Sequence, residues 1–82
     1  IDSDLLTADI LAVPGVLQAH DLHVWTMTSG YILLTVHVVA RDDMPADGLL
    51  HHINEMFQQE WGITHTTVQI EYTNREHKEH QH

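Results

Sequence analysis

The fold is decided by residues 16–40, which read VLQAHDLHVWTM (16–27), TSG (28–30) and YILLTVHVVA (31–40). The two flanking segments are rich in β-branched and aromatic residues, and the middle segment has the composition of a tight turn. This pattern predicts a hairpin of two antiparallel strands.

A helix is predicted on each side of the hairpin. Ser3 and Asp4 offer N-cap oxygens, and Pro14-Gly15 ends a first helix over about residues 3–12, whose apolar face is Leu5, Leu6, Ile10 and Leu11. Pro45 suits a first helical turn. The second helix is predicted over about residues 46–60 from the helical spacing of Leu49, Leu50, Ile53, Met56 and Phe57.

A third strand is predicted over Thr66 to Tyr72, where apolar and polar residues alternate. The fold class is therefore α+β: a metallochaperone-like, ferredoxin-like αββαβ sandwich without its first strand, with two helices on a three-stranded mixed sheet. We expect residues 1–72 to form one domain and residues 73–82 to be a flexible histidine-containing tail.

The composition points to cations as ligands. The 82 residues include nine His, twelve Asp+Glu, three Lys+Arg and no Cys, for a formal charge of −9. This charge argues against nucleic acid or anionic lipid as a partner, because both are bound through Lys and Arg. Imidazoles beside carboxylates are ligands that zinc and similar ions prefer.

The length and hydropathy of the chain limit the size of its core and the class of protein it can be. A chain this short buries only about 60% of its unfolded surface, so we expect a partner or a bound ion to add stability. No apolar run approaches the roughly 18 residues of a membrane span, and the N-terminus has no signal-peptide pattern.

Strand parity predicts a metal site on one face of the sheet. With a two-residue loop at Ser29-Gly30, Leu22 lies opposite His37, and His20 lies diagonally beside His37 on the same face. The odd-numbered residues of the third strand, including Glu71, are expected on this face. His20, His37 and Glu71 then form an N/N/O ligand set.

Three neighbouring residues are expected to lie apart from this set. If the third strand runs parallel to the second, His65 falls about 20 Å from Glu71, six residues along the strand. Asp21 and His23 are expected on the opposite face from His20, although Asp21 could accept a hydrogen bond from a ligand imidazole.

The sequence resembles the C-terminal cytoplasmic domain of cation diffusion facilitator transporters, most of all the cobalt-zinc-cadmium efflux branch. Four motifs carry this resemblance in order: HDLHVW (20–25), TSG (28–30), LTVHVV (34–39) and GITHTTVQIE (62–71). The likeness covers about residues 3–72.

The resemblance implies a zinc-binding domain, with Co²⁺ or Cd²⁺ as other candidates. Such a domain forms a homodimer on the cytoplasmic side of a six-helix metal/proton antiporter, whose membrane domain is not in this chain. The resemblance also places the metal ligands at His20, His37, His65 and Glu71. Some members have a ligand histidine at the position of Gln69, and the resemblance therefore gives no support here to a second, bridged ion.

Other histidines have plainer interpretations. His23 beside Trp25, and His51 and His52 on the second predicted helix, are more often structural or solvent-facing than ligands. The tail histidines (His77, His80 and His82) are typical of weak, flexible metal scavengers.

The sequence gives weaker support to two other classes of function. A metal-dependent hydrolase would need His20 and Asp21 on one face, and the sequence has no serine elbow, phosphate loop or HExxH motif, so we expect no enzyme activity. An ACT-like small-molecule regulatory module has a similar fold, but residues 28–30 are too short to cradle a ligand.

Overall fold

The computed structural model describes residues 1–73. The elements are α1 (Ser3–Leu11), β1 (Val16–Thr26), β2 (Ile32–Ala40), α2 (Ala46–Trp61) and β3 (His65–Tyr72). This αββαβ order confirms the predicted α+β fold, and each predicted helix and strand boundary lies within one residue of the observed one. The predicted tail lies outside the described residues, apart from Thr73.

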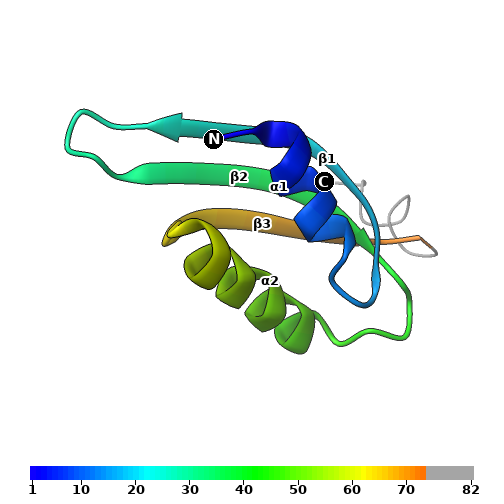
Figure 1. Ribbon diagram of the computed structural model, residues 1–82. Coiled ribbons are helices and arrows are strands. Elements are labelled where there is room, and N and C mark those ends of the chain that lie inside the picture. Colours follow the sequence, from blue (N-terminus) through cyan, green and yellow to red (C-terminus); the bar gives the residue numbers. More distant parts are fainter. Residues whose placement is uncertain (74–82) are drawn as a thin grey trace, which may run out of the picture.

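The sheet has the order β1-β2-β3, with β1 antiparallel and β3 parallel to β2. Both helices cover one face of this sheet (Figure 1). We call the other face, which neither helix covers, the outer face. Neither helix of the described residues is long and apolar enough to cross a membrane.

The core lies between the helices and the inner face of the sheet. It is built from buried apolar side chains of both helices, β2 and the turn before β3: Leu6, Ile10, Leu34, Val36, Val38, Ala40, Leu49, Ile53, Phe57 and Ile63. The core residues of β2 are all even-numbered, so its odd-numbered residues lie on the outer face, because side chains alternate along a strand.

The ends of the helices differ in part from prediction. Asp2, and not Ser3 or Asp4, is the N-cap of α1, since its Oδ1 accepts hydrogen bonds from the backbone N–H groups of Asp4 (2.9 Å) and Leu5 (3.3 Å). At the end of α2, the indole Nε1 of Trp61 donates to Asp9 Oδ2 at 2.9 Å, which ties α2 to α1.

Gly15 is required where α1 turns into β1. Its φ is +96°, and a Cβ there would lie 2.6 Å from Cγ and Cε of Met44. We expect Gly15→Ala to lower the free energy of unfolding by about 1–3 kcal/mol, because it adds both backbone strain and a steric clash. Urea unfolding measures this change.

Gly48→Ala is the matched control. A Cβ at this α2 position meets no atom within 4 Å, so alanine should raise the free energy of unfolding by about 0.4–1 kcal/mol. Equal effects of the two substitutions would contradict the role given to Gly15.

Candidate metal site

A β-bulge in β1 builds the centre of the site. His23 pairs with Thr35 and His20 pairs with His37, so two residues of β1, Asp21 and Leu22, stand opposite a single residue of β2. Asp21 adopts a φ of 55°, in the left-handed region that Asp tolerates better than most residues. The extra residue lets His20 and Asp21 both lie on the outer face, while Leu22 packs against the core.

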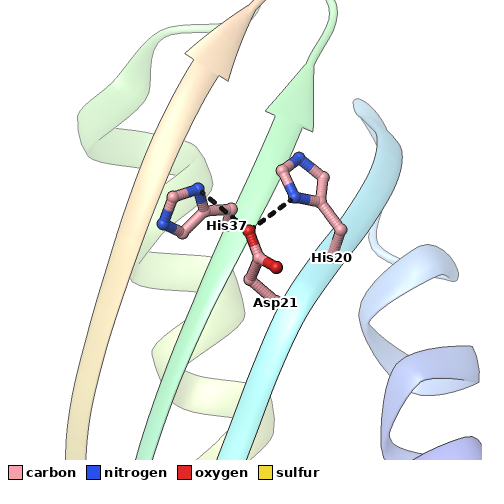
Figure 2. A group of neighbouring side chains, drawn as sticks. All are labelled: His20, Asp21 and His37. Carbon is pink, nitrogen blue, oxygen red and sulfur yellow. Dashed lines mark hydrogen bonds and ion pairs between the residues drawn. The ribbon is translucent and has the colours of Figure 1, made fainter.

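The carboxylate of Asp21 lies between two imidazoles (Figure 2). Its Oδ2 is 3.3 Å from Nδ1 of His20 and 3.9 Å from Nδ1 of His37. The two imidazole rings come from neighbouring strands, and their centroids are 5.4 Å apart. One ligand atom each from His20, Asp21 and His37 lies within 4.8 Å of the others, which is close enough for a single ion to contact all three.

Glu71 reaches the same pair of imidazoles from β3. Its Oε2 is 3.2 Å from Nδ1 of His37, and its Oε1 is 3.7 Å from Nε2 of His20. Only 13% of its side chain is exposed, compared with 65% for Asp21. A half-buried carboxylate needs a hydrogen-bonding or charged partner, and here the described partners are the two histidines.

No Lys or Arg neutralises these carboxylates within residues 1–73. Arg41 is the only such residue in that range, and it donates from Nε (3.1 Å) and Nη2 (3.2 Å) to the carboxylate of Asp43. These hydrogen bonds lower the pKa of Asp43 below its usual value. Within residues 1–73, the described partners of the two carboxylates beside His20 and His37 are therefore the imidazoles alone.

The arrangement offers two imidazoles and two carboxylates from three strands. His20, Asp21 and His37 form one group of ligand atoms and Glu71 lies beside both imidazoles, so the outer face gathers N and O donors of the kind that suit Zn²⁺, Co²⁺ or Cd²⁺. Of the four ligands expected from the sequence, the structure brings His20, His37 and Glu71 together.

His65 lies at the other end of the sheet. It pairs with Leu33 at the start of β3, and its ring contacts that of Tyr31 edge-on, with centroids 4.8 Å apart. Glu71 is six residues further along the strand, which separates it from His65 by about 20 Å.

The predicted register of the hairpin was wrong in two places. The backbone N–H of Met27 donates to the carbonyl of Tyr31, which leaves a three-residue loop, 28–30, in place of the two-residue loop. Gly30 supplies the positive φ (93°) that such a loop requires. The bulge adds a second one-residue offset, so His20 lies directly opposite His37 instead of diagonally beside it.

The predicted faces of Asp21 and His23 were also wrong. Both lie on the outer face with His20, because the bulge breaks the alternation of side chains within β1. Sequence reasoning therefore missed Asp21 as a candidate ligand. A bulge within a strand leaves little local signal in the sequence, although Asp is one of the residues that tolerate positive φ.

Comparisons with known proteins point to one family. The family model described as "Cation efflux protein, cytoplasmic domain" matches residues 1–73. The metal cation efflux system protein CzcD of Cupriavidus metallidurans is 44% identical over 73 residues, which cover 85% of this chain and 23% of that protein. The vacuolar zinc transporter TgZnT of Toxoplasma gondii is 37% identical over 73 residues, covering 89% of this chain and 8% of that protein.

A solved structure with the same fold has a related sequence. The structure described as the metal-bound C-terminal domain of the CzcD transporter superposes with a TM-score of 0.82 at 40% identity, covering 87% of this chain and 99% of that one. This chain spans only 8–23% of the length of the two curated relatives above. On the family model and on these identities, the chain belongs to the family of cytoplasmic domains of cation efflux proteins.

Proposed function

We propose that this chain is the regulatory domain of a divalent-cation efflux transporter and that it binds Zn²⁺ on the outer face of its sheet. His20, Asp21, His37 and Glu71 hold the ion, and Co²⁺ or Cd²⁺ suit the same donors. The observation that carries this proposal is the position of Glu71, half-buried between two imidazoles with no Lys or Arg of residues 1–73 to neutralise it.

The descriptions of two similar proteins support a metal ion as what this chain binds. One is described as a zinc transporter, and the solved CzcD domain is described as metal-bound. His65 is set apart from the other expected ligands, so it does not contribute to the ion in this proposal.

Zinc binding is coupled to homodimer formation. Each protomer has a formal charge of −9, which opposes the close approach of two copies. A bound divalent cation reduces this repulsion and fixes β1, β2 and β3 relative to one another. It shifts the monomer–dimer equilibrium only as far as its affinities for the two forms differ.

In the full-length transporter this domain lies at the cytoplasmic face of the membrane. The cytoplasmic concentration of metal sets the fraction of the compact dimer, and the dimer geometry acts on the attached membrane domain. Partners of the chain are thus a second copy of itself, divalent cations and the membrane domain.

Sedimentation velocity tests this proposal directly. Zn²⁺ should raise the sedimentation coefficient of the wild-type chain toward that of a dimer, and EDTA should reverse the change. His20→Ala should abolish the response, because it removes the imidazole that contacts both Asp21 and Glu71.

Mg²⁺ is the matched metal control. It prefers six oxygen ligands and gives up its water reluctantly, so it should leave the sedimentation coefficient close to that of the metal-free protein. An equal response to Zn²⁺ in wild type and His20→Ala would contradict the proposal, as would an equal response of wild type to Mg²⁺.

A further inference from the structure

The end of the hairpin gathers exposed apolar side chains. Trp25, Met27 and Tyr31 are 43%, 48% and 58% exposed, and they lie in or beside the loop between β1 and β2. Trp25 stands opposite Leu33 on the outer face, and the ring of Tyr31 lies against that of His65. We call Trp25, Met27 and Tyr31 the tip patch.

The tip patch lies in an uncharged stretch of a strongly acidic chain. Residues 24–36 contain no Asp, Glu, Lys, Arg or His, although the chain has a formal charge of −9. Exposed apolar side chains that lie together mark a surface that contacts a partner or a membrane. Trp and Tyr, which are apolar with one polar group, are enriched at the boundary between a membrane and water. The tip patch therefore fits a bilayer surface that attracts it without charge.

The loop of the hairpin projects beyond the third strand. β3 begins at His65, which pairs with Leu33, and Figure 1 shows the loop between β1 and β2 extending past this point. A projecting loop offers little flat surface to a second copy of this chain. It can enter the headgroup region of a bilayer, where interfacial segments lie buried by about 5–10 Å.

The first residue of the chain lies near the tip patch. Ile1 is exposed, and with Trp25 and Thr26 it lines a hollow of about 300 Å³ beside β1. The proposed function makes this chain the C-terminal domain of a transporter, as the similar CzcD domain is described, so the membrane domain is joined ahead of Ile1. A short connection of this kind raises the effective concentration of the tip patch at the bilayer to about the millimolar range.

We propose that the tip patch docks on the cytoplasmic surface of the bilayer, with Trp25, Met27 and Tyr31 among the lipid headgroups. This contact rests on the proposed function, which attaches the domain to a membrane. It fixes the orientation of the sheet relative to the membrane. It leaves the metal site accessible, because His37 is four residues from Leu33, about 13 Å along β2.

Quenching of Trp25 fluorescence by brominated lipid tests this contact. The 82-residue chain has no cysteine, so one cysteine added ahead of Ile1 couples it to a maleimide lipid in phosphatidylcholine vesicles, in place of the membrane domain. The emission of Trp25 is the difference between the wild-type chain and Trp25→Phe. It should be at least about twofold lower in vesicles of acyl-brominated phosphatidylcholine than in unbrominated ones.

Tyr31→Glu should remove most of this quenching, because a charged side chain is disfavoured in the apolar layer. Leu17→Glu is the matched control. Leu17 is 47% exposed and lies at the start of β1, at the opposite end of that strand from the loop. The same added charge there should leave the quenching unchanged.

Three results would overturn the contact with the bilayer. They are no quenching in the wild-type chain, equal losses in Tyr31→Glu and Leu17→Glu, and loss of the zinc-induced dimer in Tyr31→Glu without vesicles, which would assign the tip patch to a second copy. All three leave the metal site standing. Zinc calorimetry separates the two proposals: Tyr31→Glu should keep the affinity for Zn²⁺ within about twofold of wild type, and a wild-type chain that binds no Zn²⁺ would overturn the proposed function.

Discussion

Replacing His37 by alanine should lower the affinity for Zn²⁺ by at least about 100-fold. Even partners that only orient a metal ligand are worth about 10–100-fold in affinity, and His37 is placed to bind the ion itself. It lies on the central strand, 3.2 Å from Glu71 and 3.9 Å from Asp21. Zinc calorimetry measures the loss.

The metal-free fold should survive this substitution. The His37 side chain is 36% exposed and points away from the core, so the free energy of unfolding without zinc should change by less than about 1 kcal/mol. His65→Ala is the control, since it removes another histidine from the outer face, at the far end of β3. It should leave the affinity for Zn²⁺ within about twofold of wild type, and an equal loss in both variants would contradict the assigned ligands.

Deleting Asp21 should remove the bulge and the metal affinity together while preserving the fold. The deletion leaves His20 opposite His37 and His23 opposite Thr35, so every remaining side chain of β1 keeps its face. It also removes a residue with a φ of 55°, whose strain costs about 1 kcal/mol or more. We expect an unchanged or slightly higher free energy of unfolding, and a zinc affinity lowered at least about tenfold.

Two variants make this experiment specific. Asp21→Asn keeps the bulge, because Asn also tolerates positive φ, and should lose a similar part of the zinc affinity through the missing charge. Deleting Val24, in the regular part of the strand, reverses the faces of the residues on one side of the deletion and should destabilise the fold strongly. Equal destabilisation by the two deletions would show that Asp21 is not an inserted bulge residue.

The sequence predicts the fold well because its local signals agree with one another. The helical spacing of the apolar residues of α2, the turn residues 28–30 and the alternation in β3 each favour one structure, and the observed elements follow them. Only details differ, such as the N-cap, where Asp2 takes the place of Ser3 or Asp4 through local hydrogen bonds.

The site was less predictable than the fold, because the face that a strand residue occupies depends on the number of residues between it and the turn. The three-residue loop and the bulge each shift the hairpin by one residue, and the two shifts leave His20 and His37 on one face as predicted. Between the two shifts, however, the predicted faces are reversed, and this is where Asp21 and His23 lie. A one-residue offset inside a strand leaves the hydrophobic pattern on its flanks intact, so the pattern could not reveal it.

The class of function followed from several motifs taken together. Histidines beside carboxylates favour a metal, and the HDLHVW and GITHTTVQIE segments resemble the transporter domain; membership of that family confirms this interpretation over an enzyme. One sequence argument against a hydrolase is that strand alternation predicts His20 and Asp21 on opposite faces. That reason was wrong, since the two side chains share a face.

Anomalous diffraction at the zinc absorption edge, from crystals grown with Zn²⁺, tests the central claim most directly. The account predicts an anomalous peak within about 2.0–2.2 Å of a ring nitrogen of His20, a ring nitrogen of His37 and a carboxylate oxygen of Glu71 or Asp21. Anomalous peaks found only at other histidines, with none between His20 and His37, would contradict the account.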